Sequence, residues 1–271
     1  MTRWALLLEY DGTPFVGWQR QTVLLSVQSV LEDAARRLTG GAPVISIAAG
    51  RTDAGVHSEG QVVHMDLADP GGRFTPGRVR DALNFHMKPY PIAVVQAAIV
   101  PDDWSARFAA DRRRYRYRIL NRSARAALDN HRVWHVKPPL DVRAMQAGAG
   151  FLLGRHDFTS FRASSCQAKS PVRTLDRLEV LGGGATIEIH AEARSFLHHQ
   201  VRNIVGTLKL VGDGRWTPAQ VGEALAARDR AAAGPTAPPE GLCLMEVGYP
   251  VDPFRSLDVA SAPVPEPSRP A

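Results

Sequence analysis

One acidic residue, Asp53, is the strongest candidate for chemistry in this chain of 271 residues. It lies between an arginine and a glycine turn, in the run Gly50-Arg51-Thr52-Asp53-Ala54-Gly55. An apolar strand-like run, 44–49, precedes this turn, and an alternating run, 61–67, follows it. A carboxylate on a tight turn between two strands is exposed to a partner yet fixed in direction, as nucleophilic or acid–base catalysis requires. Taken alone, the run is more typical of a hairpin loop whose charged residues face water.

A strand in which arginine and tyrosine alternate, Arg112 to Ile119, is the second candidate. Side chains along a strand point alternately to its two faces. One face therefore carries Arg112, Arg114, Arg116 and Arg118, and the other carries Tyr115, Tyr117 and Ile119. Such a strand is commonly a solvated basic face over a core face. Arginines in line also form a strip that can bind phosphates, and a neighbouring tyrosine can stack on a base. The pattern favours RNA over an acidic protein as the partner.

The segment around Arg202 offers a countercharge. A helix is predicted at about 195–211, so that Arg202 follows His198 by one turn. Arg202 is either a surface cation or, if buried, needs a carboxylate partner, for which Asp53 is a candidate. Adjacent side chains on a helix point about 100° apart, so His198 and His199 diverge, and no Glu or Cys lies at a helpful spacing. We therefore expect no metal site.

The loop 10–21 combines turn residues with three aromatic side chains and has no phosphate-loop pattern. It is either a packed surface loop or a loop that contacts nucleic acid, for which Trp18 and Gln19 are the candidates.

The composition, 44% hydrophobic and 22% charged, is typical of a soluble globular chain, and no apolar run is long enough to span a bilayer. Cys166 and Cys243 belong to no Cys-x-x-Cys pair, and the N-terminus shows no signal-peptide pattern, so we expect a cytoplasmic protein. The formal net charge of +6 favours a polyanionic partner, with nucleic acid the leading candidate.

The elements that must position these residues fall into two halves. In the first half, strands are predicted at 3–9, 44–49, 61–67 and 92–100, with helices at 26–38 and from Thr75. Their order is β-α-β-β-α-β, the ferredoxin-like arrangement.

The second half repeats this order loosely. Its strands are predicted at 112–120, 173–181, 186–191 and 242–247, and its helices at 141–153, 195–211 and from Thr217. We therefore expect an α+β fold in which two ferredoxin-like halves, 1–105 and 106–250, share a mainly antiparallel sheet with a central cleft. The Pro-rich tail, 251–271, is expected to be disordered.

Seven segments in order resemble the tRNA pseudouridine synthase A family. They are Tyr10–Gln21, Gly50–His57, Arg113–Tyr117, Asp157–Arg162, Ser170–Thr174, His198–Gly206 and Gly241–Pro250. The resemblance spans about residues 3 to 250 and implies the pseudouridine synthase fold. It implies an enzyme that isomerises uridine to pseudouridine at positions 38, 39 and 40 in the anticodon stem-loop of tRNA, without cofactor or metal. It also implies a homodimer in which one tRNA contacts both subunits.

The same resemblance implies roles for individual residues. Asp53 matches the catalytic aspartate and Arg202 the basic residue that pairs with it. Tyr115 matches the tyrosine that packs on the target base and, in some proposals, takes part in removing the proton from C5. Arg51 matches the arginine that displaces the target nucleotide. Further contacts with RNA are expected from Arg112, Arg114, Arg116, Trp18, Gln19 and His198.

The sequence departs from the family pattern at three places. The turn Lys88-Pro89-Tyr90-Pro91 lacks the usual acidic residue, Gln200 replaces a methionine, and Ser58-Glu59 replaces smaller residues. These changes bear on contacts with RNA and remove no catalytic group.

Two other functions remain as alternatives. A catalytically silent RNA-binding module would bind without turnover, although the intact Asp53 loop argues against it. A metal-dependent hydrolase using Asp53 and the histidines is a distant third. For an isomerase, the sequence leaves open whether Asp53 attacks C1′, attacks C6 or abstracts a proton.

Overall fold

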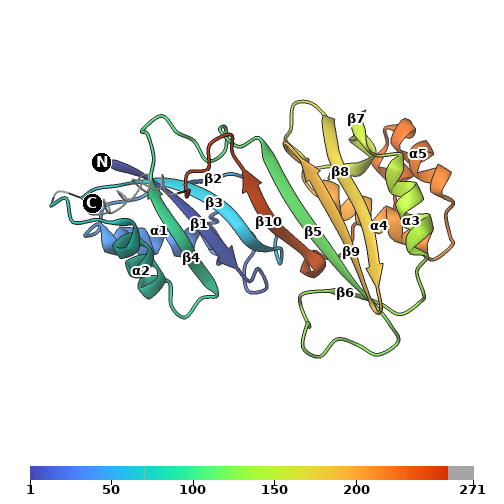
Figure 1. Cartoon of the computed structure of the whole chain (residues 1–271), viewed down its shortest axis with the longest axis horizontal. Helices are drawn as coiled ribbons and strands as arrows, with labels where there is room; N and C mark the ends of the chain where they lie inside the picture. The colour runs from blue at the N-terminus through green and yellow to red at the C-terminus, as the bar shows by residue number, and fades with distance from the viewer. Residues whose placement is uncertain (70, 256–271) are drawn as a thin grey trace, which may run out of the picture.

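A mixed sheet of ten strands runs through the computed structural model, which describes residues 1–69 and 71–255 (Figure 1). The strands are β1 (Thr2–Tyr10), β2 (Ser46–Ala48), β3 (His57–Leu67), β4 (Ile92–Ile99), β5 (Arg112–Asn121), β6 (Trp134–Val136), β7 (Gly154–Asp157), β8 (Val172–Gly183), β9 (Thr186–Ala193) and β10 (Leu242–Gly248). The helices are α1 (Val27–Leu38), α2 (Pro76–Met87), α3 (Val142–Gly150), α4 (Gln200–Gly212) and α5 (Pro218–Ala227), with short 3₁₀ turns η1 (Thr159–Phe161), η2 (Arg230–Ala232) and η3 (Pro239–Gly241).

The first half has the predicted ferredoxin-like topology. Its strands lie in the order β4-β1-β3, with β2 beside β3, and all three pairings are antiparallel. Alternation along β1 directs Trp4, Leu6 and Leu8 into one core, where they pack with apolar residues of α1 and α2. Ser26 begins α1 as the helix was predicted to begin, because its side chain accepts a hydrogen bond from the Ser29 backbone.

The second half repeats the same strand order. β10, β5, β9 and β8 are neighbours, β7 extends the outer edge, and β6 pairs with the end of β5. Tyr117 and Ile119 of β5 pack with Ile204 and Leu208 of α4 in a second core. The two groups of helices lie at the two ends of the sheet (Figure 1). The α+β class with two similar halves is thus confirmed, while the short strands β6 and β7 were not predicted.

The two halves join where β3 meets β10. β3 is long enough to pair with two strands along one edge: its C-terminal part pairs with β2, and its first two residues pair in parallel with Cys243 and Leu244 of β10. The loop that carries Asp53 connects β2 to β3. It therefore emerges beside the junction of the two halves.

The predicted helix at 195–211 begins later than expected. Its first residue is Gln200, and residues 195–199 form a loop. His199 takes a left-handed backbone conformation with φ of 61°, which ends any helix continuing from before it. The Gln200 side chain accepts a hydrogen bond from the Leu197 backbone at 2.8 Å and so stabilises the turn into α4. The unusual residue at this position therefore has a structural role.

Two further observations concern the chain ends and the membrane. The predicted disorder of the tail falls mostly on residues 256–271, which lie outside the described residues. Across residues 1–69 and 71–255, every helix is too short or too polar to cross a bilayer.

Candidate active site

Three nitrogen-bearing side chains from the second half surround the carboxylate of Asp53. Arg202 Nη1 lies 3.0 Å from Asp53 Oδ2, and His199 Nε2 lies 3.4 Å from the same oxygen. His198 Nε2 lies 3.3 Å from Oδ1. The side chains of Asp53 and Arg202 are 18% and 13% exposed, which limits solvent screening of their attraction. The structure thus brings together Asp53, Arg202 and His198, and adds His199.

The Asp53 loop is fixed from beneath by the loop 10–21. The Trp18 backbone donates to Thr52 O at 3.0 Å, and the Tyr10 hydroxyl lies 2.8 Å from the Thr52 hydroxyl. Gly17 has φ of +102°, and a Cβ at this position would lie 2.7 Å from Thr52 O. The close approach of the two loops therefore requires glycine. Trp18 is 2% exposed and belongs to the core of the first half, whereas Gln19 is exposed.

Arg202 is directed toward Asp53 by a second contact. It lies in the first turn of α4, and its Nε donates to Ala237 O at 2.8 Å while Nη1 reaches the carboxylate. The guanidinium is thus held between a carbonyl and Asp53. The attraction between this guanidinium and the carboxylate fixes the direction of the Asp53 side chain.

His199 is a residue that the sequence analysis did not select. Burial lowers the pKa of its imidazole, and the positive charges of Arg202 and Arg230 act in the same direction, while Asp53 opposes them. His199 is therefore neutral at pH 7. The predicted helix hid its role, because the left-handed backbone at His199 directs its ring toward Asp53 beside that of His198, with ring centroids 4.0 Å apart.

Tyr115 lies on the face of β5 that packs toward α4. Its ring is largely buried and meets the Phe196 ring edge-on, with centroids 5.2 Å apart. Burial raises the pKa of the Tyr115 phenol well above its usual range, and the negative charge of Asp53 raises it further. The hydroxyl is therefore protonated at physiological pH. Such a tyrosine offers an uncharged aromatic surface near the carboxylate.

Arg51 lies two residues before Asp53 on the same loop. Its side chain is exposed, and within residues 1–69 and 71–255 it forms no ion pair. Arg51 is consequently available to an external anion.

The arginine strip of β5 lies on the opposite face of the sheet from Tyr115, as alternation requires. Each of its arginines has an acidic partner. The pairs are Arg112–Glu246 at 2.9 Å, Arg114–Glu192 and Arg114–Glu246 at 3.0 Å, Arg116–Glu59 at 3.0 Å and Arg118–Asp129 at 3.3 Å. The structure therefore does not bring Arg112, Arg114 or Arg116 together with Asp53, and their contact with RNA stays a prediction.

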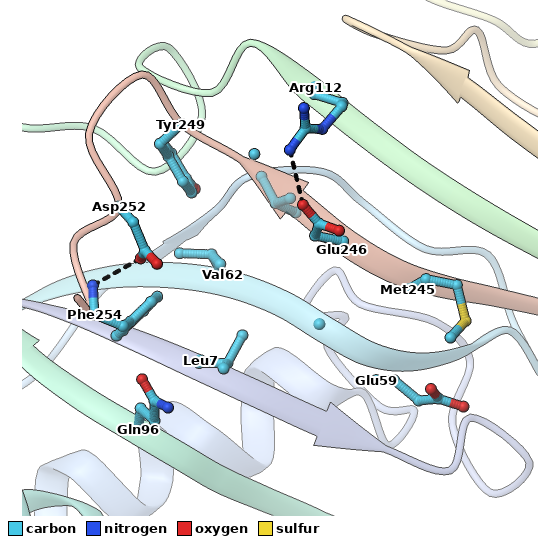
Figure 2. A pocket seen from close by; sticks show the side chains of 13 residues that line it. Leu7, Glu59, Val62, Gln96, Arg112, Met245, Glu246, Tyr249, Asp252 and Phe254 are labelled. Atoms are coloured by element: carbon cyan, nitrogen blue, oxygen red, sulfur yellow. Dashed lines mark hydrogen bonds and ion pairs between the residues drawn. The ribbon is translucent and has the colours of Figure 1, made fainter. Parts of the chain in front are cut away.

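A pocket of about 370 Å³ opens on this same face (Figure 2). Figure 2 shows Arg112 and Glu246 paired at one side of it, with Leu7 and Gln96 across the strands. Because these lining residues alternate with those that face the helices, the pocket is separate from the Asp53 site.

Among the described residues, Asp53, His198 and His199 are grouped closely enough to hold a metal ion. One ligand atom from each lies within 4.8 Å of the others. The prediction that His198 and His199 diverge on a helix is wrong, because both precede α4 and both face Asp53. However, Arg202 already binds the same carboxylate, so a metal ion would lie beside a fixed positive charge. The absence of a metal requirement stays a prediction.

Comparison with known proteins gives close matches over nearly the whole chain. Residues 7–109 and 149–250 match the family model described as tRNA pseudouridine synthase. This chain is 66%, 54% and 59% identical to proteins named tRNA pseudouridine synthase A from Acidiphilium cryptum, Gluconobacter oxydans and Paramagnetospirillum magneticum, respectively. These alignments cover 94%, 94% and 92% of this chain and 99%, 92% and 96% of the relatives. One chain in the crystal structure of a Cbf5-Nop10-Gar1 complex is 11% identical to this chain, with a TM-score of 0.37. The match covers 90% of this chain and 49% of that chain, and the likeness is distant.

Proposed function

The chain belongs to the tRNA pseudouridine synthase family, and we propose that it isomerises uridine to pseudouridine at positions 38, 39 and 40 in the anticodon stem-loop of tRNA. The relatives that carry the name tRNA pseudouridine synthase A support tRNA as the substrate. The three positions rest on the resemblance of the sequence segments described above. The observation that carries the chemistry is the ion pair between Asp53 and Arg202 at the junction of the two halves.

The reaction requires the uracil to be detached and turned. The N1–C1′ bond breaks, a C5–C1′ bond forms, and the proton on C5 is lost while N1 gains one. A base within a stem must first leave its stack, which costs a few kcal/mol. Arg51, exposed on the loop that carries Asp53, is the group that we assign to the vacated space and the adjacent phosphates.

Asp53 acts in this proposal as the catalytic nucleophile. Its two oxygens differ: Oδ2 is engaged by both Arg202 and His199, whereas the ion pair of Oδ1 within residues 1–69 and 71–255 is with His198, whose side chain is 42% exposed. Oδ1 is therefore the oxygen that a substrate reaches by displacing a single partner. Arg202 fixes the direction of the carboxylate through its contact with Oδ2.

Tyr115 supplies the surface on which the flipped base rests. Its edge contact with Phe196 helps to fix the plane of its ring. Because the phenol stays protonated, the tyrosine brings no negative charge that would repel the ionised aspartate. We further propose a homodimer acting without a cofactor, as the family resemblance implies, and a cytoplasmic location, as the two unpaired cysteines indicate.

The assay follows tritium release from C5-labelled uridine in a tRNA anticodon arm. Wild-type protein is expected to release tritium. The Asp53→Asn variant is expected to bind the RNA but to release no tritium. Asp66→Asn is the matched control, because Asp66 also pairs with an arginine, Arg3 at 2.8 Å, in a pairing that involves neither Asp53 nor α4. An Asp53→Ala protein that still turns over would overturn the role of Asp53.

The tRNA positions need a second experiment. Pseudouridine is mapped in tRNAs from cells with and without this protein, and its loss at positions 38 to 40 is expected in the cells that lack it. Binding without turnover by wild-type protein would instead support the silent RNA-binding module.

A further inference from the structure

The guanidinium of Arg113 is buried and contacts no carboxylate among the described residues. Arg113 is 7% exposed, at the start of β5. Its Nη1 donates to Ala110 O at 3.1 Å and to Arg194 O at 2.6 Å. Its Nη2 donates to Ala49 O at 2.8 Å and to Arg107 O at 2.9 Å. One side chain thus joins four backbone carbonyls.

These carbonyls come from the segments that meet at the candidate active site. Ala49 lies four residues before Asp53, and Arg194 lies four residues before His198. Arg107 belongs to the connection between β4 of the first half and β5 of the second. A single rigid group is therefore bonded to the base of the Asp53 loop, to the base of the loop that precedes α4, and to the link between the two halves.

Arginine is a poor choice here if stability is its only role. A buried cation without a carboxylate partner is costly, and an apolar residue of similar size is often as stabilising. Burial indeed lowers the pKa of Arg113, although an arginine stays charged at physiological pH. What arginine provides is a planar fork of donors at fixed angles. Lysine has one ammonium nitrogen and cannot reproduce that spacing.

We propose that Arg113 is a positioning residue that sets the Asp53 loop against the loop carrying His198 and His199, and so sets the distance from Asp53 to Arg202. It touches neither reacting group itself. Displacements of about 1 Å at a reaction centre can cost about 100-fold in rate, so loss of the shared donor is felt in turnover. This inference rests on the proposed function for its kinetic consequence, although not for its geometric one.

The kinetic test compares Arg113→Lys and Arg113→Met with wild type in the tritium-release assay. For both variants we expect kcat to fall at least about tenfold while the Kd for tRNA changes less than about threefold, because the defect lies in alignment and not in binding. Tyr249→Phe is the matched control. It removes a hydrogen bond to the same link, from the Tyr249 hydroxyl to Ala106 O at 2.8 Å, without touching either loop.

Thermal unfolding separates alignment from general damage. Tyr249→Phe is expected to lower the unfolding midpoint and to keep the wild-type kcat.

In Arg113→Ala, guanidinium ion at millimolar concentration is expected to restore kcat, whereas urea at the same concentration is not. Wild-type kcat in folded Arg113→Lys and Arg113→Met, or an equal loss of kcat in Tyr249→Phe, would overturn the inference.

A second measurement needs no turnover. The coupling free energy between Asp53→Asn and Arg202→Met is obtained from a double-mutant cycle of unfolding, in the wild-type background and again with Arg113→Lys. The coupling is expected to shrink in the second background. An unchanged coupling overturns the inference even if the protein proves not to be an isomerase, whereas absent tritium release by wild type counts against the proposed function alone.

Discussion

Arg202 Nη1 lies 3.0 Å from Asp53 Oδ2, although the two residues are 149 positions apart in the chain. Asp53 comes from the first half and Arg202 from the second, so the pair depends on the junction of the halves, where β3 meets β10. The same junction brings His198 and His199 to the carboxylate. The chemistry of the candidate site is therefore a property of the junction, and predictions about it can be separated from predictions about either half.

Tyr115→Phe is expected to keep the aromatic surface and the edge contact with Phe196, and so to leave the affinity for tRNA unchanged. Any loss should then appear in kcat, because only the hydroxyl is missing. Tyr115→Ala removes the ring and should weaken binding as well, by about 1–3 kcal/mol if the base stacks on it. Equal effects of the two substitutions on the Kd for tRNA would contradict a stacking role.

Arg51 and the strip arginines should differ in their dependence on salt. Arg51→Ala is expected to weaken binding to tRNA and to reduce the slope of log K against log salt by about 0.7–0.9, as one lost phosphate contact predicts. Arg114→Ala should reduce the slope by less than Arg51→Ala does, because Arg114 already pairs with Glu192 and Glu246. A larger loss of slope in Arg114→Ala than in Arg51→Ala would show that the strip is the RNA surface.

Gly17→Ala and Gly41→Ala form a matched pair, since both glycines have φ of +102°. Each substitution should cost about 1–2 kcal/mol in the free energy of unfolding from the strained backbone. At Gly17 the new Cβ also meets Thr52 O at 2.7 Å, whereas at Gly41 nothing lies within 4 Å. Gly17→Ala should therefore unfold at a lower urea concentration than Gly41→Ala does, and it should also lose turnover. Equal turnover in the two variants would show that this contact does not position Asp53.

Asp213 makes a pH-dependent contribution to stability at the end of α4. Burial alone would raise the pKa of its carboxyl group, but hydrogen bonds from Arg215 and Lys209 outweigh burial and lower the pKa from 3.8 to about 2. The carboxylate therefore stabilises the folded state above about pH 4, and this contribution is lost as the pH falls toward 2.

The test of that contribution is urea unfolding of Asp213→Asn from pH 7 to pH 3. The variant should be about 1 kcal/mol less stable than wild type at pH 7, since Arg215 is exposed and its share is screened. The difference should narrow between pH 5 and pH 3. Asp176→Asn, at an exposed position, serves as the control and should show no such narrowing.

Removal of metal ions should leave turnover unchanged. Arg202 supplies the positive charge that an ion at Asp53 would otherwise bring. The measurement is tritium release after dialysis against EDTA, with and without added Zn²⁺. A loss that Zn²⁺ restores would favour a metal bound by Asp53, His198 and His199, whose ligand atoms lie within 4.8 Å of one another.

The order of strands and helices could be predicted because period-2 and period-3.6 patterns are strong in both halves. The strands β6 and β7, of three and four residues, are too short to show any period. The start of α4 was misplaced because Leu197 continues the apolar spacing of the helix, whereas the left-handed backbone of His199 leaves no mark in residue types. The contact of His199 with Asp53 depends on that backbone conformation and therefore could not be predicted from the residue types.

Arg113 left a signal that could have been used. Alternation along Arg112 to Ile119 places it with Tyr115 and Tyr117 on the core face of β5, where an arginine needs partners. Those partners are carbonyls from distant segments, which no local pattern identifies. The sequence could therefore indicate that Arg113 was unusual, and only the fold could show what it binds.

The central place of β10 has a consequence for biosynthesis. Of the ten strands it is the last to leave the ribosome, yet it fills the position between β3 and β5 in the middle of the sheet. A nascent chain that stops before Leu242 leaves that position empty, so its two halves share no continuous sheet and Asp53 has no fixed neighbour in α4. The candidate site is thus completed only after β10 has been synthesised, and products terminated before Leu242 are expected to leave cellular tRNA unmodified.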